Sequence, residues 1–268
     1  MRDGGVLVEH DMQQGMDSLE AMVIVVLFLA FLFYPLAAAL TSLKFRPWPL
    51  YRCFLWGFGI FSIALVITGP LAEFAQGNFV GHMWTHLLLG MLAPLLLVLA
   101  MPMKLLLRSL PVPLARKVSW LLKSKPFQLL SNPITALILN IGGLYVLYLT
   151  SLFEWMHQSS IVYLIVHLHV FLAGYLFTAS IIYIDITAHR LSFLFRSIIL
   201  IVSLAAHKIL AKRIYADPPA GVPGDQGEAG GQVMYYGGDF VELVLIIILC
   251  YQWYKATAPR KSESVEEG

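Results

Sequence analysis

Seven long apolar blocks constrain the fold of this chain more than any other feature. They lie at 19–40, 51–69, 80–100, 132–150, 161–184, 194–211 and 237–254. Each block can cross the hydrocarbon core of a membrane as an α-helix, which takes about 20 residues. Only 13% of the 268 residues are charged, about half the share in soluble domains. We predict an all-α polytopic membrane protein: a polar N-terminal tail (1–18), a domain of seven transmembrane helices (19–254) and a C-terminal tail (255–268).

Basic residues between the blocks predict the orientation of the helices. Lys and Arg gather in 41–52, 101–131 and 190–196 and after residue 254, whereas the alternate connections near 70–79 and 151–160 contain none. Because cytoplasmic loops are enriched in Lys and Arg, we expect the N-terminus outside and the C-terminal tail in the cytoplasm. Three basic residues do not fit this orientation, because they lie at the outer end of the sixth helix: Lys208, Lys212 and Arg213. The segment 214–236 is rich in Gly and Pro, which predicts irregular structure.

Five histidines of the membrane blocks fall at one predicted depth. His82 and His86 are about one helical turn apart, so they share a face of their helix. His167 and His169 lie about two turns into the fifth block, and His207 lies about one turn from the outer end of the sixth. Ionisable residues within a membrane mark functional sites. His167 and His169 point about 200° apart, so we expect only one of them to face the others.

Imidazole and thioether together form a ligand set that suits copper, and the thioether selects Cu(I). Met83 and Met234 lie on the predicted outer side with the histidines. The sequence therefore predicts a copper site near the outer surface. Its candidate ligands are His82, His86, His207 and one of His167 and His169, with Met83 and Met234 as weaker candidates.

Simpler roles are open for several of these residues. A histidine near a helix end commonly bonds a neighbour or faces the headgroups, which is our expectation for His157. Methionines in apolar helices mostly serve packing. Asp239 and Glu242 stand at the predicted start of the seventh helix, where acidic residues act as caps.

Other function classes receive less support. A haem-binding electron carrier would need a second histidine pair in the inner half of the membrane, and the sequence has none there. A transporter needs polar residues along the whole path, and the helices offer few. The sequence shows no nucleophile–base arrangement, phosphate-binding loop or paired carboxylates, so we expect no enzyme. It also lacks a basic stripe for nucleic acid. The few polar residues in the middle and inner half are Asn140, Thr178, Ser180 and Ser203.

Several separate stretches together carry a family resemblance. They are His82–Leu89 with Ala93-Pro94 and Met101-Pro102, His169–Phe177, Ile184-Asp185 with His189–Ser192 and Arg196, Ala206-His207, and Asp225-Gln226, Gly230-Gly231 and Met234-Tyr235 with Gly237-Gly238. In order and spacing they resemble the CtaG family of bacterial polytopic cytochrome c oxidase assembly factors, over about residues 20 to 255. The chain departs from the family pattern at Ile186, Lys208 and Tyr235.

The resemblance implies a plasma-membrane protein that helps to mature an aa3-like or caa3-like haem–copper oxidase by supplying copper to one of its centres. The implied partners are the oxidase subunits, an extracytoplasmic copper carrier and membrane lipid. The resemblance also favours His169 over His167 as the ligand from the fifth helix. A metal-free scaffold for oxidase assembly stays open beside the copper donor.

Overall fold

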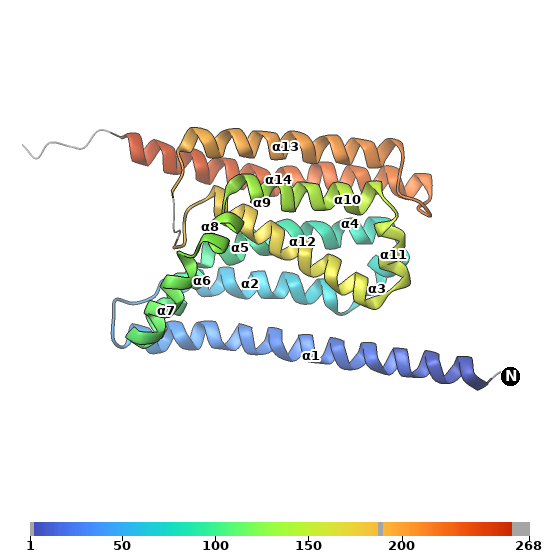
Figure 1. Cartoon of the computed structure of the whole chain (residues 1–268), viewed down its shortest axis with the longest axis horizontal. Helices are drawn as coiled ribbons and strands as arrows, with labels where there is room; N and C mark the ends of the chain where they lie inside the picture. The colour runs from blue at the N-terminus through green and yellow to red at the C-terminus, as the bar shows by residue number, and fades with distance from the viewer. Residues whose placement is uncertain (1–2, 187–189, 259–268) are drawn as a thin grey trace, which may run out of the picture.

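The long helices run side by side as a bundle (Figure 1). The computed structural model describes residues 3–186 and 190–258, with side chains from residue 21 onward; His189 and residues 259–268 of the predicted tail lie outside this range. Within it, six helices are long and apolar enough to cross a membrane, and a bent pair can make a seventh. No strand occurs in the described ranges. These features confirm the predicted fold class.

In chain order the elements are α1 (Asp3–Ser42), α2 (Leu50–Ile67), α3 (Pro70–Gly77), α4 (Phe79–Leu87), the π-helix η1 (Leu88–Leu92), α5 (Ala93–Ala100), α6 (Pro102–Ser109), α7 (Val112–Leu122), α8 (Lys125–Leu130), α9 (Pro133–Leu137), the π-helix η2 (Ile138–Gly142), α10 (Gly143–Leu149), α11 (Leu152–Gln158), α12 (Ser160–Ile181), α13 (Phe193–Ala216) and α14 (Gly224–Thr257). The start of α1, α3, α11 and the connection from α13 to α14 lie at one end of the bundle, which we call the N-terminal end (Figure 1). The short helices α6, α7 and α8 lie toward the other end.

Proline at position 94 explains the π-helix in the span Phe79–Ala100. Proline has no backbone N–H, so Pro94 cannot donate to the carbonyl of Gly90, four residues earlier. The chain widens instead, and the N–H of Ala93 donates to the carbonyl of Leu88, five residues earlier. The Gly90 carbonyl faces Gly174 of α12, where an added Cβ would lie 2.0 Å from its oxygen. The local sequence thus sets how closely η1 and α12 approach.

The seventh helix begins much earlier than predicted. α13 continues to Ala216 and α14 begins at Gly224, so the prediction of irregular structure over 214–236 is wrong outside a short connection. The glycines serve helix contact: a Cβ at Gly231 would lie 2.9 Å from the Ala211 carbonyl oxygen, and one at Gly230 would lie 2.6 Å from Phe79. Small residues allow membrane helices to pack closely, which propensities measured in water do not capture.

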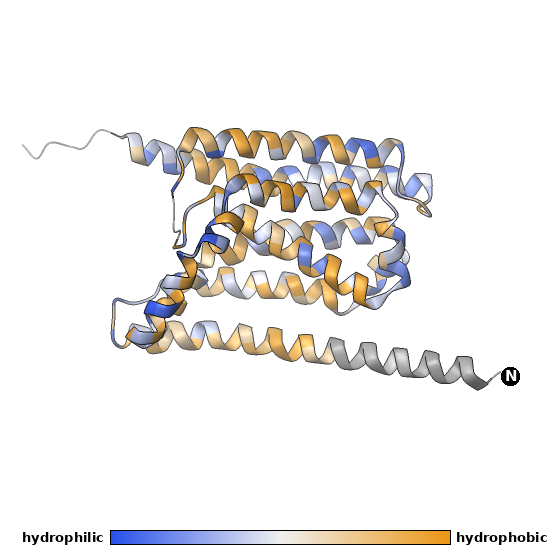
Figure 2. Ribbon diagram, viewed as in Figure 1, coloured by the Kyte–Doolittle hydropathy of each residue, from blue (hydrophilic) through white to orange (hydrophobic). Residues whose placement is uncertain are grey.

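Asp239 and Glu242 consequently lie far inside α14, and the expectation that they cap its start is wrong. Asp239 instead forms an ion pair with Lys208, whose Nζ also donates to the Tyr235 carbonyl at 3.0 Å. Arg213 pairs with Asp217 one turn later. Two of the three basic residues that disagree with the positive-inside pattern are therefore matched by acidic partners. Figure 2 shows hydrophilic residues at the C-terminal end of α13 and in the short helices, whereas the long helices are mostly apolar.

Asp185 joins two parts of the chain at the end opposite to the N-terminal end. Its carboxylate oxygens accept hydrogen bonds from the N–H groups of Met103 (2.8 Å) and Lys104 (2.9 Å), in the first turn of α6. Burial raises the pKa of the Asp185 carboxyl, while its backbone donors lower it in part. The Asp185 side chain, in the connection between α12 and α13, thus accepts from N–H groups in the first turn of α6, where a helix has no acceptors of its own.

We expect Asp185→Ala to lower the free energy of unfolding by about 2 kcal/mol, because the substitution leaves two N–H groups of α6 without this acceptor. Thermal unfolding of the detergent-solubilised protein measures the loss. Asp185→Asn keeps one carbonyl acceptor and should lose less. Equal midpoints for wild type and Asp185→Ala would contradict this role.

Candidate metal centre

The structure separates the clustered histidines into two groups along the bundle. The inner pair consists of His86 from α4 and His207 from α13, with ring centroids 6.1 Å apart. The outer trio consists of His82 from α4, His157 from α11 and His167 from α12. The ring of His82 lies 6.3 Å from that of His157 and 6.1 Å from that of His167.

The inner pair is buried, and most of its ring nitrogens have no partner. His86 and His207 are 5% and 2% exposed. Among the residues that the structure describes, neither nitrogen of His86 nor Nε2 of His207 makes a hydrogen bond. A buried polar group left unpaired costs about 1–3 kcal/mol, so such atoms in a native protein require an explanation. Binding of an external ligand provides one.

Glu242 adds a carboxyl group beside the inner pair. Its Oε1 lies 3.1 Å from Nδ1 of His207, within ion-pair range, but the direction of the contact does not make a hydrogen bond. Its Oε2 has no hydrogen-bond partner in the described chain. Sequence reasoning missed this role because it placed Glu242 at a helix start. The available signal was a carboxylate within an apolar block, which is expensive unless used.

A cavity of about 30 Å³ lies against the inner pair. It has room for about one water molecule or one ion. The π-helices η1 and η2 both border it, a common position for such bulges at functional sites. Its polar lining comprises His86, His207, Glu242, Asn140, Thr178 and Ser203.

The outer trio is more open and more fully bonded. His82 is buried, and its Nε2 lies in hydrogen-bond contact with the Tyr148 hydroxyl at 3.1 Å. His167 is half-buried and its Nδ1 donates to the Tyr163 carbonyl at 2.8 Å. The exposed His157 was not among the predicted ligands. It reaches the trio because α10 and α11 meet at a 77° bend, which sequence patterns do not reveal.

His169 has a different environment from His167. Its Nε2 donates to the carbonyl of Leu139 in η2 at 3.1 Å, and a Cβ at Gly143 would lie 2.5 Å from the same nitrogen. Among the described rings, none of the other histidines contacts it. The histidine of the fifth block that lies against His82 is therefore His167, not the His169 that the resemblance favours.

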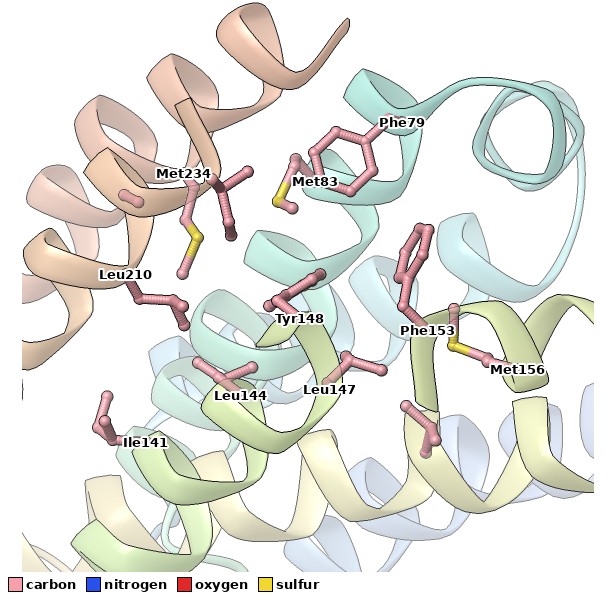
Figure 3. Close-up of a cluster of buried hydrophobic side chains, with 13 residues drawn as sticks. Phe79, Met83, Ile141, Leu144, Leu147, Tyr148, Phe153, Met156, Leu210 and Met234 are labelled. Carbon is pink, nitrogen blue, oxygen red and sulfur yellow. The ribbon is translucent and has the colours of Figure 1, made fainter. Parts of the chain in front are cut away.

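Met83 and Met234 are completely buried in an apolar cluster between α4 and α14 (Figure 3). Tyr148 and Leu210 belong to the same cluster. Neither methionine borders the cavity at the inner pair. Their ligand roles stay predictions, as do those of the histidines.

The donor chemistry of the inner pair fits Cu(I) as a cargo ion. No three His, Cys, Asp or Glu side chains in 21–186 and 190–258 stand close enough to enclose a metal ion. Two imidazoles with one metal ion between them have ring centres roughly 6 Å apart, for metal–nitrogen distances of about 2 Å. The observed separation of 6.1 Å matches this value. Imidazole is a ligand that suits copper, and Cu(I) accepts such ligands at low coordination number.

The fold and the buried histidines define a polytopic membrane protein with a histidine-lined cavity inside its helix bundle. The family model for the cytochrome c oxidase caa3 assembly factor (Caa3_CtaG) matches residues 30–256, and the chain belongs to this family. An uncharacterized protein of Mycobacterium bovis is 34% identical over 172 residues, which are 59% of this chain and 25% of that protein. One of Mycobacterium leprae is 28% identical over 230 residues, 78% of this chain and 35% of that protein. The chain thus spans about a quarter to a third of the length of these relatives. No solved structure matches.

Proposed function

We propose that the chain binds Cu(I) between His86 and His207 and delivers it to a copper centre of a caa3-type oxidase during assembly. The observation that carries this proposal is the inner pair itself, with unpaired buried nitrogens on both rings. Membership of the assembly-factor family supplies the recipient, the oxidase subunits. The role is that of a non-enzymatic metallochaperone in the bacterial plasma membrane.

The arrangement of charge supports an orientation with the N-terminus outside. The connections rich in Lys and Arg lie at the end opposite to the N-terminal end, as cytoplasmic loops do. Both histidine groups lie toward the N-terminal end: for the outer trio, His82 is in the first turn of α4 and His157 is in α11, and for the inner pair, His86 follows His82 by one turn in α4. The site then faces the extracytoplasmic side, where a copper carrier and an oxidase copper domain can reach it.

The interior beyond the inner pair supports delivery on one side of the membrane over transport across it. Asn140, Thr178 and Ser203 border the cavity, but a cluster of buried apolar side chains from α5, α12, α13 and α14 continues from there. Ile181 and Leu249 belong to this cluster. Apolar packing of this kind offers no ligands for an ion. A cavity of about 30 Å³ is also far too small for a haem.

Metal counting tests the proposal. The full chain is purified in mild detergent, loaded with Cu(I) under reducing conditions, desalted and assayed for copper per chain. We expect His86→Ala and His207→Ala each to lose one equivalent, because each removes one of two ligands. His169→Gln is the matched control, since it changes a histidine of the same bundle but keeps a donor for the Leu139 carbonyl. Wild-type protein without copper, or unchanged counts in both alanine variants, would contradict copper binding and favour a metal-free scaffold.

A further inference from the structure

We infer that His82, His157 and His167 form a second, outer Cu(I) site through which the ion passes on its way to the inner pair. This inference rests on the proposed function and extends it to the entry route. The outer trio draws one histidine from each of three helices. The ring centroids of His167 and His157 lie 6.1 and 6.3 Å from that of His82. These separations resemble the 6.1 Å of the inner pair.

The hydrogen bonds of two members leave a nitrogen available for metal. Nδ1 of His157 donates to the Phe153 carbonyl at 2.9 Å, and Nδ1 of His167 donates to the Tyr163 carbonyl at 2.8 Å. A carbonyl can only accept, so in the neutral ring the proton is on Nδ1 and the lone pair is on Nε2. Metal-binding histidines are commonly held in this way, with the second ring nitrogen bonded to a backbone carbonyl.

Exposure decreases along the proposed path. His157 is exposed, His167 is half-buried and His82 is buried. An ion arriving from outside therefore meets His157 first. The trio does not enclose a metal ion as it stands, and its exposed member, His157, is held through Nδ1 by the Phe153 carbonyl, which leaves its Nε2 for an arriving ion. A loose ligand set suits a transfer site, because a closed one would retain the ion.

Tyr148 connects the two groups. Its ring centroid lies 5.9 Å from that of His82 and 6.3 Å from that of His86, and its hydroxyl contacts His82. His82 and His86 are one turn apart on the same helix face, about 6 Å along the axis. An ion released by His82 therefore has its next imidazole one helical turn deeper, with Tyr148 as the side chain beside both.

Transfer kinetics test the outer site. Cu(I) is presented as a coloured chelate to full-length wild type and to the His157→Ala/His167→Ala double variant, and the loss of chelate absorbance gives rate and stoichiometry. We expect the double variant to lose the outer equivalent and to load the inner pair roughly ten-fold more slowly. His157→Ala alone, at an exposed position that tolerates change, should slow loading in the same direction. His169→Gln should match wild type.

The outcomes separate this inference from the proposed function. An outer site predicts that His86→Ala/His207→Ala still binds one equivalent, which the additional loss of His157 and His167 removes. Wild-type rate and stoichiometry in the double variant would overturn the outer site while leaving the inner pair in place. Copper absent from wild type would overturn both. Loss of all copper in the double variant would overturn the two-site arrangement, since the inner pair should still fill.

Discussion

Gly174→Ala should destabilise the bundle by about 3 kcal/mol or more, because its methyl group has no space. A Cβ at this position would lie 2.0 Å from the carbonyl oxygen of Gly90 and 3.3 Å from Pro94 Cγ. The obstacle is backbone, so side-chain rotation cannot relieve it, and α12 must move away from η1. Because Gly174 also borders the cavity, the displacement should disturb the inner pair.

The measurement is the unfolding midpoint in detergent, where a loss of this size lowers the melting temperature by roughly 10 °C. Gly142→Ala is the matched control, since its Cβ would meet only Ile138 Cγ2 at 3.8 Å. Alanine there should be neutral or slightly stabilising, because it favours helix over glycine by up to about 1 kcal/mol. Similar midpoints for the two variants would show that η1 and α12 do not approach this closely.

The second large effect is expected in living cells. If the inner pair delivers copper as proposed, His86→Ala/His207→Ala in place of wild type should lower the activity of the caa3-type oxidase by roughly ten-fold, because the delivery step is lost. The oxidase polypeptides should still reach the membrane, since both substitutions are at buried positions and leave the surface of the chain unchanged. Oxidase activity, copper content and subunit abundance are measured in the same membranes.

Copper in the medium separates delivery from scaffolding. Excess copper should partly restore the double variant, because it bypasses a delivery step, and His169→Gln should behave as wild type throughout. Full oxidase activity in the double variant, together with its loss when the whole protein is deleted, would support the metal-free scaffold and refute delivery from the inner pair.

Several features of this protein follow from local sequence. The apolar blocks determine the transmembrane helices, because a backbone in lipid must satisfy its own hydrogen bonds. The spacing of His82 and His86 determines that they share a helix face. Pro94 determines a break in the regular helix, since it removes one N–H. The accumulation of histidines toward one end of the bundle also follows from their positions within the blocks.

Other features depend on which helices meet. The glycines of α14 predict a loop by composition, yet they form a helix because Phe79 and Ala211 pack against them. Glu242 joins the site only through its contact with His207 on a neighbouring helix. No spacing within one helix encodes such contacts between helices.

The division of the histidines into two groups was also decided by tertiary structure. The end of the bundle toward which they lie could be read along each helix, but rotation about the helix axes and the bend before α11 set which rings meet. His157 entered the outer trio through that bend, and His167 rather than His169 lies against His82. The sequence by itself determined the existence of the transmembrane helices and the end of the bundle toward which the histidines lie. Packing decided the site, because the direction of a side chain between helices depends on neighbours distant in the chain.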